Sequence, residues 1–181
     1  ARMASQRFPN KPMVNIAGVP MIERVWRQGV KANIGDVFVA CSESEVFDHI
    51  SSIGGNAIMT DPNLPSGTDR IFAAYSLLKN KDEYESIINL QGDMPLIDPE
   101  NIKSVNFPLI NGFEIGTICT NISENEEKNK NITKVLIDWK KPKTLGNSVD
   151  FYKSSKRILI NIYQHVGIYS FRPTALKTFI T

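Results

Sequence analysis

Short runs of apolar residues alternate along the chain with stretches in which apolar residues recur every three or four positions. The runs are brief and rich in β-branched residues, and they cover residues 36–41, 86–90, 115–119, 134–137 and 166–169. The first two barely alternate between apolar and polar side chains, as is typical of strands covered on both faces. This order predicts an α/β fold with a largely parallel sheet flanked by helices.

The helices predicted between these runs are marked by their first residues. The start signals are, in chain order, Pro20, the capping-box pair Ser42 and Glu45, Ser66 or Thr68, and the pair Asp98 and Pro99. Residues 123–131 are polar and predict a surface loop. Residues 140–156 are basic and show no clear pattern, so the sequence leaves the continuity of the chain open there.

Size and composition favour one domain over two. The chain has 181 residues, with 21 Lys and Arg against 19 Asp and Glu, and this balance argues against a nucleic-acid-binding protein. No apolar run approaches the ~20 residues that span a bilayer, so we expect no membrane segment. The cysteines, Cys41 and Cys119, adjoin or lie within apolar runs and are predicted to be buried, reduced thiols, which favours a cytoplasmic protein.

Basic side chains concentrate at the start of the sequence. The first eleven residues contain three cations, Arg2, Arg7 and Lys11, and no acidic side chain precedes Glu23. Prolines in the same segment keep its backbone extended. Guanidinium forks match phosphate oxygens and a lysine adds a compact charge, so this loop fits a site for a polyanion. Composition alone fits a solvated arm equally well. The loop has no glycine and is therefore neither a Walker loop nor a GxGxxG turn.

A second cluster, residues 66–70 (Ser-Gly-Thr-Asp-Arg), lies at the predicted start of a helix. Gly67 allows close approach of the backbone, and the free N–H groups of a helix N-terminus attract anions. An ordinary helix cap explains the same residues, and taken alone it is the better interpretation. Arg70 opposes the helix dipole in the first turn, which favours a role directed at a ligand.

Asp93 follows the predicted strand at 86–90, so its carboxylate should emerge at the C-terminal end of that strand. In open α/β sheets this edge holds the ligand crevice. A carboxylate there can hold Mg²⁺ against nucleotide phosphates, because Mg²⁺ needs few protein ligands when phosphates supply others. A turn formed by Gly92 and Asp93 is the alternative, and the position after a strand favours the functional interpretation.

His165 and Tyr169 share a face of the last predicted strand, because side chains alternate with period two. His165 could bind a substrate or be an ordinary core histidine, and the second is the better interpretation of this residue alone. His49 receives no role. The sequence shows no nucleophile–base–acid set and no zinc-type spacing of cysteine and histidine, so hydrolase and zinc functions lack support.

Taken together and in this order, the clusters resemble the 3-deoxy-manno-octulosonate (Kdo) cytidylyltransferase family, whose members make CMP-Kdo for bacterial lipopolysaccharide. The segments that carry the resemblance span nearly the whole chain; they are residues 1–12, 20–22, 66–70, 91–95 and 165–169. Residues 1–12 and 91–95 also resemble cytidylyltransferases that act on sialic acid, so the acceptor is less firmly indicated than the reaction.

The resemblance implies a single domain over residues 1–181 with a Rossmann-like, mostly parallel sheet of the nucleotide-diphospho-sugar transferase type and a small dimerisation region. It also implies a homodimer, CTP and Kdo as substrates, and Mg²⁺ as cofactor. The implied site residues are Arg2, Ser5, Arg7, Lys11, Ser66, Gly67 and Thr68 for the nucleotide, Arg70, Gln91, His165 and Tyr169 for the sugar acid, Lys11 and Asp93 for catalysis, and Asp93 for the metal.

The sequence departs from the family pattern in places. Family members usually have Glu where Met94 stands, and residues 150–155 only loosely follow the expected Tyr-Phe-Ser-Arg segment. We expect the first strand to precede Ala1, and the C-terminal helices with a second metal-binding Asp to follow Thr181.

The reaction implied by the resemblance is in-line attack by the anomeric hydroxyl of Kdo on the α-phosphate of CTP, which expels pyrophosphate. One alternative is another sugar nucleotidyltransferase, acting on a neuraminic-type acid or using a different nucleotide. The other is a non-catalytic relative that only binds a nucleotide or sugar. Loss of Lys11 or Asp93 would mark such a relative, and both residues are present.

Overall fold

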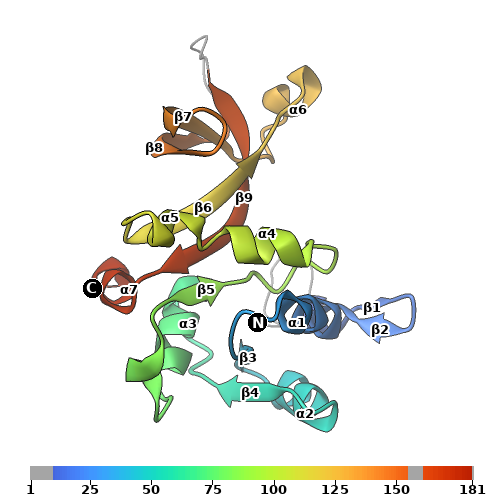
Figure 1. Cartoon of the computed structure of the whole chain (residues 1–181). Helices are drawn as coiled ribbons and strands as arrows, with labels where there is room; N and C mark the ends of the chain where they lie inside the picture. Colours follow the sequence, from blue (N-terminus) through green and yellow to red (C-terminus); the bar gives the residue numbers. More distant parts are fainter. Residues whose placement is uncertain (1–9, 155–160, 181) are drawn as a thin grey trace. The chain divides into compact units, whose positions relative to one another are not determined.

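Helices and strands alternate along most of the chain in the computed structural model, and three consecutive strands precede the last helix (Figure 1). The structure describes residues 10–154 and 161–180, in two compact units. The first unit ends at Gly116 and resumes at Ile168, and the second consists of residues 117–167. Strands β6 and β9 contribute residues to both units.

The elements confirm each predicted strand run and each predicted helix, and add others. The helices are α1 (Met21–Ala32), α2 (Ser44–Ser52), α3 (Gly67–Ser76), α4 (Pro99–Ser104), α5 (Phe107–Ile110), α6 (Glu124–Lys128) and α7 (Pro173–Ile180), with the 3₁₀ turns η1 (Lys11–Met13) and η2 (Lys81–Glu83). The strands are β1 (Asn15–Ile16), β2 (Val19–Pro20), β3 (Phe38–Cys41), β4 (Asn56–Met59), β5 (Ile87–Asn89), β6 (Ile115–Thr120), β7 (Lys134–Lys141), β8 (Leu145–Tyr152) and β9 (Ile162–Phe171).

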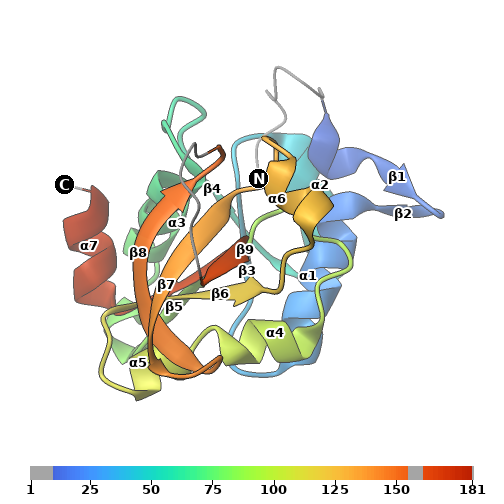
Figure 2. The same ribbon diagram turned by 90° about the horizontal axis from the view of Figure 1, so that it is seen from above.

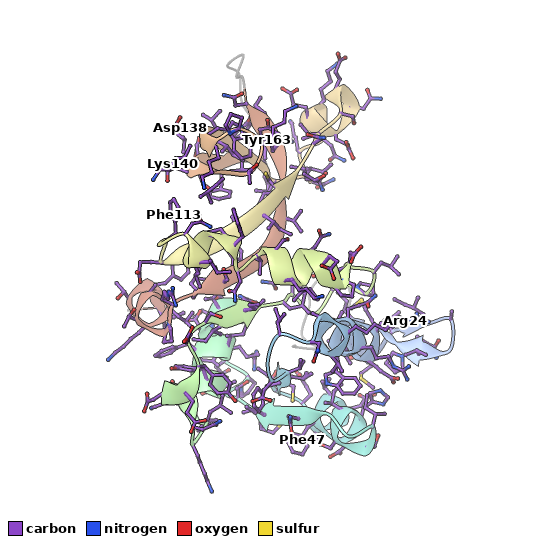
Figure 3. The ribbon with its side chains drawn as sticks, in the orientation of Figure 1. Arg24, Phe47, Phe113, Asp138, Lys140 and Tyr163 are labelled. Atoms are coloured by element: carbon purple, nitrogen blue, oxygen red, sulfur yellow. The ribbon has the colours of Figure 1, made fainter. Side chains whose placement is uncertain are left out.

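In the first unit, β3, α2 and β4 form a parallel βαβ crossover. The two strands pair in register from Phe38 opposite Asn56 to Cys41 opposite Met59. The core beneath them consists of the buried side chains of Ile22, Val39, Cys41, Val46 and Ile50, against which Trp26 and Phe47 pack. Phe47 projects from α2, which covers this pair of strands (Figure 3). Burial of this apolar surface stabilises the crossover.

The strand that precedes Asp93, β5, is paired with a strand from the last part of the chain, β9. Strand β5 pairs antiparallel with β9, with Ile87 opposite Phe171 and Asn89 opposite Tyr169. This register places Tyr169 beside the last residue of β5. Asn89 is almost fully buried there, at 2% exposed. The strand pairing therefore fixes the backbone from which residues 91–93 continue.

The second unit is built on an antiparallel hairpin. Strands β7 and β8 run side by side (Figure 2), and β7 also pairs antiparallel with the first part of β9, Lys134 opposite Gln164. Lys134 is fully buried, and its Nζ donates to the main-chain oxygens of Asn129 and Lys153, at 2.5 and 2.9 Å. The buried ammonium thereby ties the turn before β7 to the residues after β8.

The mixed α/β class is confirmed, but the largely parallel sheet is not. Among the described residues, the pairing of β3 with β4 is parallel, whereas β5–β9, β7–β8 and β7–β9 are antiparallel. A strand covered on both faces has the same apolar pattern in either direction, so the pattern does not fix direction. The small dimerisation region stays a prediction.

Several local predictions differ from the structure. The capping box of Ser42 and Glu45 is wrong, because α2 begins at Ser44 and its N-cap residue, Glu43, makes no side-chain cap hydrogen bond. The loop predicted at 123–131 contains α6, which has a complete capping box formed by Ser123 and Glu126. The unpatterned stretch 140–156 contains the end of β7 and all of β8, and its last two residues lie outside the described part.

Helix α1 is tied to its surroundings by polar side chains. Arg24 reaches towards the β1–β2 hairpin (Figure 3), where its Nε donates to the Ile16 oxygen at 2.9 Å. Glu23 is buried, accepts from Arg27 Nε at 2.8 Å, and lies 2.8 Å from His49 Nε2 of α2. His49, which the sequence left without a role, thus joins α2 to α1. No helix in the described part of the chain is long and apolar enough to cross a membrane.

We expect Glu23→Gln to lower the free energy of unfolding by about 1.5 kcal/mol. The substitution removes the charge that strengthens the contacts of Glu23 with Arg27 and His49, both of which are partly exposed. Burial acts to raise the pKa of Glu23, but Arg27 and His49 together outweigh it and lower the pKa below its usual 4.5. The stabilisation is therefore present above pH 4.5 and is lost as the pH falls through the folded-state pKa. Urea unfolding at pH 7 and below 4 would measure it, and exposed Glu45→Gln is the control.

Candidate active site

An ion pair joins the start of the described chain to the end of β5. Lys11 Nζ lies 2.6 Å from Asp93 Oδ2, although the residues are 82 positions apart. Lys11 opens the turn η1, whose N-cap residue, Asn10, has a left-handed backbone with φ of 55°. Pro12 anchors the turn by being buried. The side chains of Lys11 and Asp93 remain 36% and 49% exposed, so a ligand can reach both.

The start of α3 lies against the segment that follows β5. Ser66, rather than Thr68, is the N-cap residue, and its Oγ accepts from the Asp69 N–H at 3.2 Å. The Ser66 hydroxyl also donates to the Asp69 carboxylate. A Cβ on Gly67 would be in ordinary van der Waals contact with Gln91 Oε1, at 3.6 Å, so the first residue of α3 lies beside Gln91. The first main-chain N–H groups of α3 therefore lie near the side-chain amide of Gln91.

Asn89 connects these parts from within the core. Its Nδ2 donates to Thr68 Oγ1 at 3.3 Å, and its Oδ1 accepts from Gln91 Nε2 at 3.4 Å. Both distances are long for hydrogen bonds, but they place a buried amide between the helix start and Gln91. Sequence analysis missed Asn89. The available signal was a polar residue at the end of an otherwise apolar run, directly before the motif.

Arg70 is buried, at 3% exposed, in spite of its charge. Its Nη1 donates to Thr60 Oγ1 at 2.5 Å, and Thr60 in turn donates to the Cys41 oxygen at 2.9 Å. The Nη2 of Arg70 is buried and has no hydrogen-bond partner among the described residues. A buried guanidinium with an unused donor is costly unless an anionic or carbonyl oxygen completes it.

These side chains line one groove in the first unit. The groove has a volume of about 1160 Å³, and the predicted site residues along it are Lys11, Ser66, Gly67, Arg70, Gln91 and Asp93. Apolar residues of α1, β3 and β5 also line it, together with further polar and charged residues that include Asp36, Glu83 and Glu85. A groove that combines an apolar wall with convergent polar groups is typical of a ligand site. Folding thus brings three of the predicted clusters together.

Tyr169 and His165 are described in different units. Tyr169 in the first unit stacks on Phe171, with ring centroids 6.1 Å apart, and burial raises the pKa of its hydroxyl. His165 in the second unit has its Nε2 3.0 Å from Thr117 Oγ1, and burial lowers the pKa of its ring below 6.5. Thr117 was missed by sequence analysis. Arg2, Ser5 and Arg7 lie outside the described residues.

The groove places Asp93, the predicted metal ligand, beside Lys11. In the described part of the chain, no three His, Cys, Asp or Glu side chains gather in a way that could hold a metal. Asp93 is half exposed in the groove, and its ion pair with Lys11 engages Oδ2 of a carboxylate that has two oxygens. Mg²⁺ needs only one or two protein carboxylates when phosphates supply other ligands, so this donor set fits Mg²⁺ bound together with a nucleotide.

Comparison with known proteins agrees with the resemblance found in the sequence. The model of a family described as "Cytidylyltransferase" matches residues 1–181. The 3-deoxy-manno-octulosonate cytidylyltransferase of Paramagnetospirillum magneticum is 39% identical over 186 residues, which cover 100% of this chain and 75% of the relative. The enzyme of the same name from Rhodospirillum rubrum is 37% identical over 185 residues, covering 100% and 73%.

Solved structures give the same result. CMP:2-keto-3-deoxy-manno-octonic acid synthetase complexed with CTP superposes with a TM-score of 0.87 at 29% identity, covering 99% of this chain and 74% of that one. The 4-diphosphocytidyl-2C-methyl-D-erythritol synthase of Anaerococcus prevotii gives a TM-score of 0.60 at 10% identity, a likeness of fold alone. The chain therefore belongs to the cytidylyltransferase family, among the 3-deoxy-manno-octulosonate cytidylyltransferases.

Proposed function

We propose that this protein transfers CMP from CTP to the sugar acid Kdo and releases pyrophosphate. The observation that carries the proposal is the groove in which Lys11 and Asp93 meet 2.6 Å apart beside the N-terminus of α3. A cation, a carboxylate and free main-chain N–H groups are the groups that a nucleoside triphosphate with its metal requires. The names of the relatives supply the reaction and both substrates.

The chemistry is a displacement at phosphorus. The anomeric oxygen of Kdo forms a bond to the α-phosphorus of CTP, the bond to the pyrophosphate oxygen breaks, and the hydroxyl proton passes to the solvent. In such transfers the protein contributes mainly positioning and charge stabilisation. Lys11 would neutralise phosphate charge with Arg2 and Arg7, while Ser5, Ser66, Gly67 and Thr68 would hold the nucleotide.

Asp93 would hold Mg²⁺, which when bound supplies positive charge to the phosphates. On the sugar side, Arg70 has the buried Nη2 donor that an acidic sugar's carboxylate would satisfy. Gln91, His165 and Tyr169 would contact the remaining polar groups of the sugar. A homodimer, a cytoplasmic location and a role in lipopolysaccharide biosynthesis complete the proposal.

The proposal is tested by measuring the pyrophosphate that the protein forms from CTP and Kdo with Mg²⁺, with each of the three components omitted in turn. We expect release only when all three are present. Release with a neuraminic-type acid or with another nucleotide, but not with Kdo and CTP, would change the assigned substrate. It would leave the assigned fold and reaction type unchanged. Absence of release with every combination of sugar acid and nucleotide would contradict an enzymatic function and support a binding protein.

Protonation of the His165 ring is predicted to lower the activity in acidic solution. Because burial lowers its pKa below 6.5, the ring is neutral at pH 7 and becomes charged only in more acidic solution. If the neutral ring accepts a hydrogen bond from the sugar, kcat/KM for Kdo should fall only at a pH lower than 6.5, where the ring gains a proton. His165→Gln should be less active and should lose this acid limb. An unchanged limb in that variant would assign the titration to another group.

A further inference from the structure

A buried asparagine at the end of β5 lies between two predicted site residues. Asn89 lines the groove and is only 2% exposed. Its Nδ2 donates to Thr68 Oγ1 of α3 at 3.3 Å, and its Oδ1 accepts from Gln91 Nε2 at 3.4 Å. All three residues belong to the first unit. In the described part of the chain, no hydrogen bond joins Thr68 directly to Gln91, so Asn89 is the side chain that connects them.

The burial of Asn89 gives these two contacts their weight. A buried amide that lacks a partner is costly, and bulk water does not reach this side chain. An amide has a donor at one end and an acceptor at the other, so it can join two partners at once. Thr68 and Gln91 are themselves partly exposed, so a ligand can reach them. The buried amide thus restrains two side chains that remain accessible from outside.

We propose that Asn89 is a positioning residue that links Thr68, on the nucleotide side of the site, to Gln91, on the sugar side. Asn89 acts through these two side chains, because so little of its own surface is exposed. A change at Thr68 therefore alters the placement of Gln91, and with it the binding of the sugar acid. The assignment of the two sides rests on the proposed function, whereas the link between the side chains is a property of the protein alone.

The NMR signal of the Gln91 side-chain amide tests the link without any substrate. This signal is identified as the one that Gln91→Ala removes. We expect Thr68→Val, which keeps the shape of threonine but not its hydroxyl, to shift the signal, and Thr68→Ser to leave it close to wild type. In Asn89→Leu the signal should take a new position, which the further change Thr68→Val no longer alters. An unchanged signal in Thr68→Val, or the same shift with and without Asn89, would overturn the link.

Steady-state kinetics tests the role in binding. Loss of one hydrogen bond that orients a ligand group should raise KM for Kdo about two- to ten-fold in Thr68→Val, although Thr68 is assigned to the nucleotide. Made in Gln91→Ala, the same substitution should raise KM for Kdo no further, because the side chain through which it acts is gone. General damage to the fold would add to the effect of Gln91→Ala. Such additivity, or an unchanged KM for Kdo in Thr68→Val, would overturn the positioning role.

Asn56→Leu on β4 is the matched control for Asn89→Leu, because it makes the same change at an exposed strand position outside the groove. It should leave both the Gln91 signal and KM for Kdo at their wild-type values. If Asn89→Leu does not fold, the kinetics of Thr68→Val, alone and in Gln91→Ala, decides. The expected NMR shifts in a protein that forms no pyrophosphate would keep the link between Thr68 and Gln91 and contradict the proposed function alone.

Discussion

Asp93→Asn is expected to lower kcat about 100- to 1,000-fold while leaving the protein folded. Asparagine has the shape of aspartate but no charge, so it can neither pair with Lys11 as an ion nor hold Mg²⁺ comparably. The ion pair is too exposed to contribute much to stability, since such pairs are worth about 0–1 kcal/mol. Pyrophosphate release at saturating CTP and Kdo would measure the loss of kcat, and thermal unfolding would measure the change in stability.

Asp48→Asn on α2 is the matched control, because it makes the same change of charge at an exposed position outside the groove. Lys11→Met should also reduce kcat strongly. If Lys11 and Asp93 act on the phosphates as one charged unit, the double variant should lose less than the product of the single losses. Near-normal turnover in Asp93→Asn would contradict the role given to this residue.

Local chemistry explains which helices the sequence predicted. Ser66 and Asp98 cap α3 and α4 as expected, because a side-chain oxygen placed before an apolar stripe satisfies N–H groups within the same few residues. The same signal fails at Ser42, because the start of α2 is set by how Val46 and Ile50 pack in the core. It was missed at Ser123, because no apolar stripe follows it.

Strand partners depend on contacts that no local pattern contains. Strand β8 has mostly exposed side chains, so its hydrophobic pattern is weak and its pairing with β7 supplies the order. Strand β4 begins with a polar residue and is exposed at both ends, so its apolar pattern is too weak to recognise. The direction of β9 relative to β5 and β7 also follows from how the chain returns to the sheet, which the apolar runs do not encode.

The site was predictable as motifs but not as geometry. Lys11 and Asp93 were each selected for their local surroundings, and their contact across 82 residues needs the fold. The burial of Arg70 could not be foreseen either, because a charged residue in a first helical turn is usually exposed. Asn89 and Thr117 escaped notice because they belong to no motif and only contact predicted site residues through their side chains. Side chains of this kind carry no motif and are found only from their contacts.

Gly116→Ala is expected to lower the free energy of unfolding by about 3 kcal/mol, the second large effect. A Cβ at Gly116 would stand 2.6 Å from Ser170 Oγ and 2.7 Å from the Val105 oxygen. These two atoms are themselves joined by a buried hydrogen bond of 2.6 Å, which Ser170 donates. The methyl group must therefore separate a buried donor from its acceptor or displace the main chain, and each is costly.

Urea unfolding of Gly116→Ala measures this loss, and Glu114→Ala, which removes an exposed side chain two residues earlier, is the control. Adding Ser170→Ala to Gly116→Ala should not restore stability, because the Val105 oxygen that remains in the way is main chain and cannot move aside. Ser170 follows Tyr169 and pairs with Ile88 of β5, so the close packing at Gly116 supports the strand that leads to Asp93. A loss below about 0.5 kcal/mol, the size of an ordinary surface substitution, would show that β6 can shift to accommodate the methyl group.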